Sequence, residues 1–401
     1  MENKLNDSPA QYTDSNEIKS ASTDKCQEAS QKQENKKSLK SKLVWSFVFV
    51  GIAALTIWAI TSQEGFTFMG FIEFLGSLHP GWLACAFLGM AGFIVFEGLA
   101  IMTIIKSFGY KRPFRKGIIY STSDIYFSAI TPSASGGQPA SAYFMMRDGI
   151  PGSMTTVSLI VNLVMYSFAI VIIGIVSILM MPSAFLNFPL AGKILIIVGA
   201  LLLIGLALFF LFILYKSSVL LKMGNAILKL LAKMRIIRNL EGKQARLKSA
   251  IEEYNSHVAH LKGKGKMLVK TLICNVLQRA SLISVSLFVF LASGGDTSLA
   301  LDVWVCQCLV VIGTNMIPIP GAMGISDLML IWAFGGIGFT EAAAMNLNLA
   351  SRGISFYLSV IICGTSMIVR ILSYNIAAKM QAKKSINKES DTTIEPEEKT
   401  E

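Results

Sequence analysis

The stretch Ala129-Ile-Thr-Pro-Ser-Ala-Ser-Gly-Gly-Gln-Pro-Ala-Ser-Ala-Tyr143 lies between apolar segments, yet it contains two prolines and two adjacent glycines. An unbroken helix is unfavourable here, because proline lacks an amide donor and glycine is a poor helix former. Unpaired backbone groups are costly in hydrocarbon, so irregular chain at membrane depth survives only where protein buries it or where it lines a wet cavity. The stretch therefore predicts a broken segment inside a membrane protein.

A second stretch of the same character lies near the other end of the chain: Asn315-Met-Ile-Pro-Ile-Pro-Gly-Ala-Met-Gly-Ile-Ser-Asp327. Interrupted apolar segments in corresponding places of two halves point to the substrate site of a transporter. We expect the two loops to face each other inside the bilayer in an inverted arrangement. The sequence contains no convincing repeat at the level of single residues.

The composition supports a membrane protein. Hydrophobic residues make up 53% of the chain and charged residues 15%, with a mean hydropathy of +0.57, whereas a soluble domain has about 25% charged residues. The net charge of +11 is concentrated in a few loops, which favours membrane topology and anionic lipid over nucleic acid. The six cysteines show no paired Cys-x-x-Cys spacing, so we expect no disulfide framework, no metal and no cofactor.

The apolar pattern predicts an all-α polytopic membrane protein with about six full transmembrane helices and two re-entrant or broken hairpins, which are candidates for an inverted pair. A short apolar segment, 342–350, precedes the last span. The predicted spans are Leu43–Ile60, Trp82–Ile105, Met154–Met181, Gly192–Tyr215, Leu268–Leu291 and Ile354–Leu372, and the broken segments are Ile118–Met146 and Val303–Phe339.

Charge and polarity divide the chain further. Residues 1–42 and 376–401 are polar and are expected to be disordered cytoplasmic tails around a transmembrane domain, 43–375. Lysines flank the domain at both ends, which predicts a cytoplasmic membrane protein with both termini inside. The basic segment 216–267 admits two interpretations: an amphipathic helix pair lying on the cytoplasmic leaflet, or a solvated loop that merely obeys the charge rule.

Ionisable residues within the spans are candidates for function, because charge is expensive in the membrane. Arg279 lies midway along its span, and Arg352 lies at the start of the last one. A guanidinium grips phosphate through two parallel hydrogen bonds, which suits a phospholipid head group. The alternative is a structural ion pair with Asp327 or Glu341.

Two carboxylates lie at similar depth. Glu97 interrupts the second span, and Asp124 precedes the first loop. They could pair with the arginines, accept a cationic lipid amine or carry a proton, and the sequence does not distinguish these roles.

The loops offer a second type of anion site. Gly136 and Gly137 allow close approach of a ligand to the backbone, and Pro139 suits the first turn of a following helix. The free amides at the start of a helix attract phosphate. Pro320, Gly321 and Gly324 repeat this pattern in the second loop.

At these residues the sequence resembles the membrane region of the lysylphosphatidylglycerol synthase/flippase family. The resemblance rests on Thr131-Pro-Ser-Ala-Ser-Gly-Gly-Gln-Pro139 with Tyr143, on Arg147-Asp-Gly-Ile150, on Pro318-Ile-Pro-Gly-Ala-Met-Gly324 and on Arg352. It extends over the predicted transmembrane domain. Two positions depart from the family pattern: Ala322 stands where a second glycine is usual, and Asp327 stands where glutamate is usual.

The resemblance implies spans with re-entrant helices and a role in moving or presenting phospholipid, with aminoacylated phosphatidylglycerol as the substrate of the two-part members. Those members also carry a soluble synthase domain that uses aminoacyl-tRNA, and only a short polar segment follows Leu372 here. We assign head-group binding to Thr131, Ser133, Ser135, Gly136, Gly137, Gln138, Arg279, Pro320, Gly321, Gly324, Asp327 and Arg352, with Glu97 and Asp124 as charge partners.

Three hypotheses follow. The first is a translocator of an anionic or aminoacylated phospholipid, such as a lysylphosphatidylglycerol-like lipid. The second is a membrane subunit or enzyme of phosphatidylglycerol lysyltransferase type, acting with a separate synthase in lipid modification and cationic-peptide resistance. The third is an ion-coupled exporter of small cations. Catalysis is disfavoured, because the sequence has no Gly-x-Ser-x-Gly motif, no Walker loop and no His/Cys cluster. A homo-oligomer is compatible with all three.

Overall fold

Six helices in the part of the chain that the structure describes are long and apolar enough to cross a membrane. The structure is a computed structural model that describes residues 68–131, 134–234, 239–261, 263–315, 317, 322 and 324–373. All of them belong to the second of the two units of the chain, Met1–Gln63 and Glu64–Glu401. A helix rises by about 1.5 Å per residue. Five of these helices are therefore longer than a hydrocarbon core of about 30 Å, and the shortest, Thr297–Thr314, nearly reaches that length. The prediction of an all-α polytopic membrane protein is confirmed.

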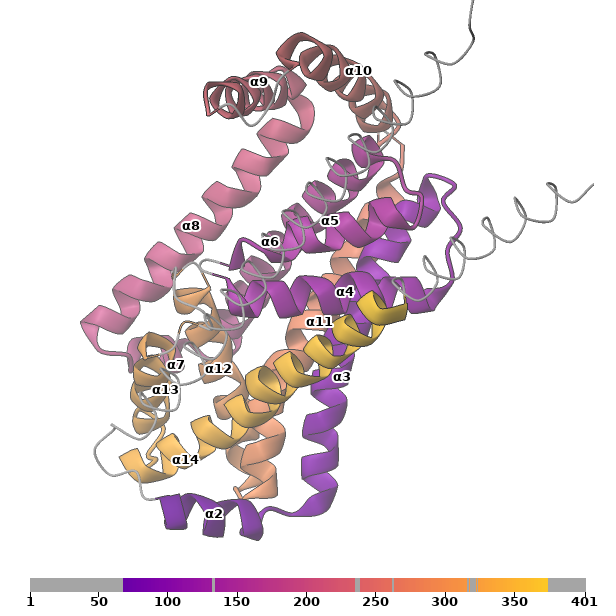
Figure 1. Ribbon diagram of the computed structural model, residues 1–401. Helices are drawn as coiled ribbons and strands as arrows, with labels where there is room; N and C mark the ends of the chain where they lie inside the picture. Colours follow the sequence, from indigo (N-terminus) through magenta and orange to yellow (C-terminus); the bar gives the residue numbers. More distant parts are fainter. Residues whose placement is uncertain are drawn as a thin grey trace, which may run out of the picture. The chain divides into compact units, whose positions relative to one another are not determined.

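The helices follow one another with short connections (Figure 1). The long apolar helices are α3 (Pro80–Ser107), α6 (Gly152–Met180), α8 (Leu190–Tyr215), α11 (Gly265–Ala292), α12 (Ala300–Thr314) preceded by the turn η3 (Thr297–Leu299), and α14 (Glu341–Arg352) continued by η5 (Gly353–Leu358). The other helices are α2 (Phe68–Ser77), α4 (Phe114–Ile130), α5 (Gly137–Arg147), α7 (Pro182–Leu186), α9 (Ser217–Lys233), α10 (Leu240–Ala259) and α13 (Ile325–Gly335).

Two details of the predicted spans need correction. The segment 342–350 and the last predicted span are one helix, Glu341–Ser373. Gly353 does not end it, because the backbone there stays right-handed and the turn η5 widens to a π-helix instead. The stretch Thr297–Thr314 is itself long enough to span, whereas we assigned its part from Val303 onward to an arm of the second hairpin. The predicted span Leu43–Ile60 and the two tails lie outside the described residues.

The helices α3 and α11 form an antiparallel pair along their whole length (Figure 1). At one end, the amide of His79 donates to the carbonyl of Ala292 at 2.7 Å. At the other end, Lys264 Nζ donates to the carbonyl of Ser107. This pair contributes the apolar core residues Phe93, Val285 and Val289 to a cluster shared with α12 and α13.

The first broken segment is a helical hairpin made of α4 and α5, as the sequence predicts. It packs closely on α3, since a Cβ atom built on Gly98 would lie 2.9 Å from the carbonyl oxygen of Gly117. Small residues permit such close helix contact in membranes. At the base of the hairpin, Asp148 accepts hydrogen bonds from Lys116 Nζ and, at 2.9 Å, from Tyr120 Oη.

The second broken segment comprises α12 and α13. Between them lies the loop that begins at Asn315 and ends at Gly324. Helix α13 packs against both α12 and α14.

Of the six candidate spans among the described residues, α8 has the smallest buried share, and it contacts α12 at Gly199. A Cβ atom built on Gly199 would lie 2.3 Å from the carbonyl oxygen of Ile312 in α12. Gly205 lies six residues further along the same helix, and a Cβ atom built on it would have no other atom within 4 Å.

This difference predicts the outcome of a matched pair of substitutions. Gly199→Ala is expected to destabilise the protein by about 1–3 kcal/mol, because the new methyl group meets backbone that has to shift. Gly205→Ala is expected to be neutral or stabilising by up to about 1 kcal/mol, because alanine favours helix. Thermal unfolding of the purified protein in detergent measures both. Equal changes in unfolding temperature for the two variants would contradict the close contact of α8 with α12 at Gly199.

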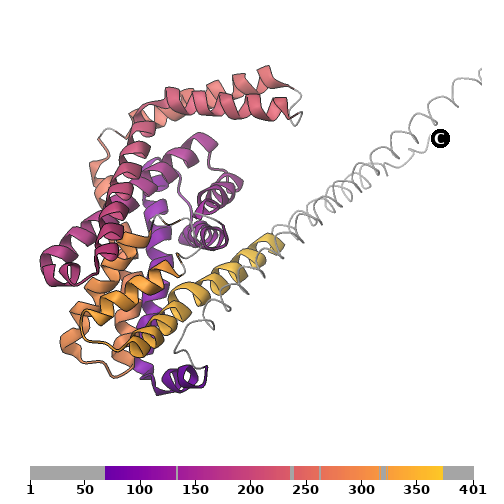
Figure 2. The same cartoon turned by 90° about the vertical axis from the view of Figure 1, so that its left-hand side faces the viewer.

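The basic segment forms the helix pair α9 and α10 (Figure 2). Helix α10 is attached to the bundle through the buried side chains of Ile251, Tyr254 and Val258. Burial raises the pKa of Tyr254 to about 12, so its hydroxyl stays protonated and donates to the carbonyl of Leu214 at 3.3 Å. Helix α9 has no buried residue.

Candidate functional site

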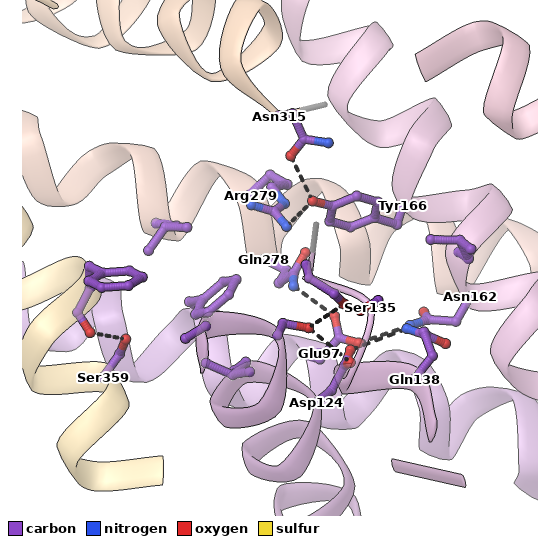
Figure 3. A pocket seen from close by; sticks show the side chains of 18 of the residues that line it. Glu97, Asp124, Ser135, Gln138, Asn162, Tyr166, Gln278, Arg279, Asn315 and Ser359 are labelled. Atoms are coloured by element: carbon purple, nitrogen blue, oxygen red, sulfur yellow. Dashed lines mark hydrogen bonds between the residues drawn. The ribbon is translucent and has the colours of Figure 1, made fainter. Parts of the chain in front are cut away.

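A cavity of about 490 Å³ lies between α3, the α4–α5 hairpin, α6, α8, α11 and the last helix (Figure 3). Its volume is in the range typical of small-molecule sites. Apolar side chains supply part of the wall, including Phe93, Leu206, Phe210, Leu282 and Phe356. The polar residues that line it are Glu97, Asp124, Ser128, Ser135, Gln138, Asn162, Tyr166, Gln278, Arg279, Asn315, Ser355 and Ser359.

Arg279 of α11 provides the positive charge of this cavity. Its Nη2 donates to Tyr166 Oη, and its guanidinium carbon lies 4.2 Å from the centre of the Tyr166 ring. Tyr166 Oη donates in turn to Asn315 Oδ1 at 3.0 Å. Arg279 forms no ion pair with any described residue, and its buried Nε has no hydrogen-bond partner among them. The protein thus positions this guanidinium through an aromatic ring and neutral groups, which leaves donors for a ligand.

Glu97 is buried in α3 and is held by amide groups. Asn162 Nδ2 donates to Glu97 Oε1 at 2.9 Å, and Gln278 Nε2 donates to Oε2 at 2.7 Å. Asn275 Nδ2 donates to Asn162 Oδ1 at 3.1 Å, so the network joins α3, α6 and α11. Gln278 Oε1 has no partner among the described residues and remains available as an acceptor.

Asp124 is the second carboxylate of the cavity and comes from α4. Its partners lie further away: Gln138 Nε2 donates to Oδ2 at 3.3 Å, and Ser128 Oγ donates to Oδ1 at 3.5 Å. Hydrogen bonds of this length are weak. The carboxylate is therefore less firmly held than Glu97, and it faces the same cavity as Arg279.

The first loop shapes the cavity wall. Ala134 and Ser135 line the cavity, while the buried Thr131 Oγ1 accepts a hydrogen bond from the amide of Gly136 at 2.8 Å. A Cβ atom built on Gly137 would lie 2.1 Å from Asp124 Oδ1. The absence of a side chain at Gly137 thus lets the two arms of the hairpin meet, a role that we did not foresee for this glycine.

The two loops share an uncommon backbone feature. Ala134 has φ of +53° and Ala322 has φ of +49°, and each precedes a glycine, Gly136 or Gly324, by two residues. A left-handed conformation costs a residue with a side chain about 1–2 kcal/mol. The family pattern that places glycine at the position of Ala322 is explained by this conformation.

Arg352 does not share the cavity of Arg279. It lines a smaller cavity of about 180 Å³ together with Ser326 and Asn348. Its Nε lies 2.8 Å from Asp327 Oδ1, which is the ion pair that we considered as the structural alternative. Asp327 Oδ2 also accepts the amide of Gly324 at 2.9 Å. The two cavities are neighbours, because Leu282, Ser355 and Phe356 line both.

The predicted site residues are therefore divided. The larger cavity brings together Ser135, Gln138, Arg279, Glu97 and Asp124. Thr131, Gly136 and Gly137 support the hairpin, and Gly324, Asp327 and Arg352 form a separate cluster. Ser133, Pro320 and Gly321 lie outside the described residues.

Sequence analysis missed Asn162, which donates a hydrogen bond to Glu97, and Tyr166, which accepts one from Arg279. A signal was present, since Ser158, Asn162 and Tyr166 recur every four residues along an apolar helix and share one face. Gln278 and Asn275 lie within about one helical turn of Arg279 in the sequence, and neither was assigned a role from the sequence.

The arrangement can bind a ligand with charges of both signs. A guanidinium binds phosphate through paired hydrogen bonds, and carboxylates in the same cavity can accept an ammonium group. The cavity has one cationic and two anionic side chains. It therefore favours a ligand that carries both a negative charge and an amine over a ligand that is only negatively charged.

Comparison with known proteins gives one match. Residues 43–363 match the family model described as "Lysylphosphatidylglycerol synthase TM region". This range includes every residue that lines the larger cavity. No curated protein and no solved structure matches the chain.

Proposed function

Because the chain belongs to the family of the lysylphosphatidylglycerol synthase transmembrane region, we propose that it binds the head group of an anionic or aminoacylated phospholipid. The head group occupies the larger cavity while the acyl chains stay in the bilayer. The protein thereby moves the lipid between leaflets or presents it at one of them. The site serves lipid transport rather than catalysis.

The observation that carries this proposal is the state of Arg279. A charged side chain within a span is expensive, and in this protein no described carboxylate forms an ion pair with it. Its direct partners include the Tyr166 ring and hydroxyl, which keep it in place without forming an ion pair. A lipid phosphate could therefore form the direct, paired hydrogen bonds that no described carboxylate makes with this guanidinium.

The carboxylates favour an aminoacylated lipid over plain phosphatidylglycerol. A lysyl ester adds ammonium groups to the head group, and Glu97 and Asp124 line the cavity that contains Arg279. Asp124 is the better candidate for the amine, because its hydrogen bonds are long and easily exchanged. Glu97 is already satisfied by two amides at normal distances.

We place the basic end of the bundle in the cytoplasm. The basic residues between α3 and α4 and those of α9 and α10 lie at the same end, since Lys264 contacts the carbonyl of Ser107. Cytoplasmic loops carry an excess of lysine and arginine. The lysines that flank the transmembrane domain at both ends favour the cytoplasmic side of the membrane for both termini as well. A separate synthase could deliver its lipid product on that side.

Leaflet exchange in reconstituted vesicles tests the proposal. Vesicles with and without the purified protein carry fluorescent phosphatidylglycerol or its lysyl ester, and dithionite quenches the label in the outer leaflet. We expect the protein to make the inner pool accessible, with faster exchange for the lysyl ester. Unchanged accessibility of every lipid would overturn the proposal. Lipid modification that appears only with an added synthase, without exchange, would favour the subunit hypothesis.

A further inference from the structure

Helix α9 exposes a continuous apolar lane that the fold of the described residues leaves uncovered. The lane consists of Met223, Ile227 and Leu230 of α9 and of Met234, the residue that caps its carboxyl end, and their exposed fractions lie between 48% and 61%. Their spacing of four, three and four residues places them on one face of the helix. Four large apolar side chains in one line require a partner, since exposure of this kind marks an interaction site.

A lane of lysines runs beside the apolar lane. Lys222, Lys229 and Lys233 are all exposed, and each precedes a residue of the apolar lane by one position. One residue along a helix corresponds to a rotation of about 100°, so the two lanes are adjacent faces. A helix with this pattern is typical of those that lie in a membrane interface.

The opposite side of α9 is already occupied. A Cβ atom built on Gly224 would lie 2.7 Å from Leu247 Cδ2 of α10, and α10 is fixed to the bundle by its own buried residues. Helix α9 is thus held against α10 on this side, and within the described part of the chain the two lanes face away from that contact.

The position of α9 identifies this partner. The helix begins at Ser217, two residues after the end of α8. Of the six candidate spans, α8 has the lowest buried share, 22% of its most apolar stretch, so its surface has to face lipid. Its last residue, Tyr215, is 57% exposed, as is common for aromatic residues at a membrane boundary. Figure 2 shows α9 and α10 turning away from the end of α8.

We propose that α9 lies on an anionic bilayer surface, with the apolar lane inserted among the acyl chains and the lysine lane bound to lipid phosphates. Charge complementarity selects an anionic lipid surface over an apolar protein partner. The helix would gather anionic lipid next to α8, which supplies Leu206 and Phe210 to the wall of the larger cavity. This proposal does not depend on the lipid-exchange activity.

Fluorescence quenching in vesicles tests it. An environment-sensitive fluorescent amino acid replaces Ile227 or, as a matched control on the lysine face, the exposed Ala226. The full-length protein is reconstituted in phosphatidylcholine with or without phosphatidylglycerol. We expect brominated acyl chains to quench the label at position 227 and water-soluble acrylamide to quench the label at position 226, with phosphatidylglycerol enhancing the difference.

Neutralising the lysine lane provides the second arm. The variant carries three substitutions: Lys222→Gln, Lys229→Gln and Lys233→Gln. We expect the ratio of membrane-bound to detached α9 to fall about 100-fold. The fall is measured as an increase in acrylamide quenching of the label at position 227. These side chains are exposed, so the fold is expected to persist. Equal acrylamide quenching at both positions in anionic vesicles would overturn the proposal. Energy transfer between labels on different copies, with protection that rises with protein density, would assign the lane to a second copy instead.

Discussion

Replacing Arg279 by glutamine is expected to slow phospholipid exchange about 100-fold. Glutamine cannot supply two charge-assisted hydrogen bonds to a phosphate, and each such bond contributes about 1.5–3 kcal/mol. Arg279→Lys keeps the charge but loses the paired geometry, so we expect an intermediate rate. The measurement is the dithionite assay with the lysyl ester of phosphatidylglycerol.

A control for this prediction lies on the same helix. Lys270 of α11 is exposed and does not line the cavity, so Lys270→Gln removes one basic charge without touching the site. Its exchange rate is expected to match that of the unchanged protein. If both variants are equally slow, net charge and not the cavity controls the rate, and the head-group assignment of Arg279 is wrong.

Replacing Asp327 by asparagine is expected to destabilise the protein by about 3–5 kcal/mol. The substitution removes the anionic partner of Arg352, whose side chain is only 14% exposed, and so removes the charge compensation that Asp327 gives to a largely buried guanidinium. The double variant Asp327→Leu, Arg352→Met removes both charges and is expected to recover most of that stability. Thermal unfolding in detergent measures both effects.

This pair of variants also separates the two roles that the sequence allows for Arg352. If Asp327→Asn left stability unchanged and abolished lipid exchange, the cluster would belong to the binding site and not to the scaffold. Loss of stability with recovery in the double variant assigns the pair to the support of the second broken segment.

The fold was predictable where a local rule decides it. Proline and paired glycines interrupt the apolar pattern at residues 132–139, and the structure has the helix ends at Ile130 and Gly137. The length and hydropathy of α3, α6, α8 and α11 likewise identified them as spans. The continuity of the last helix was not predicted, because a π-helical turn, Gly353–Leu358, joins the two segments that the sequence pattern separates.

The site was predictable only in part, since its contacts join residues far apart in the chain. An isolated arginine and an isolated glutamate within spans identified Arg279 and Glu97 as candidates. The hydrogen bond between Asn162 and Glu97 spans 65 residues of sequence, and periodicity within one helix cannot reveal such a partner. The choice of Asp327 over Glu341 as partner of Arg352 depends in the same way on how α13 packs against α14.

The position of the lipid phosphate tests the central claim most directly. An experimental structure of the protein in lipid nanodiscs containing the lysyl ester of phosphatidylglycerol would locate it. We predict a phosphate about 2.7–2.9 Å from the guanidinium nitrogens of Arg279, with the amine directed to Asp124. A cavity without a lipid phosphate, with ordered head groups only around the bundle, would contradict the account.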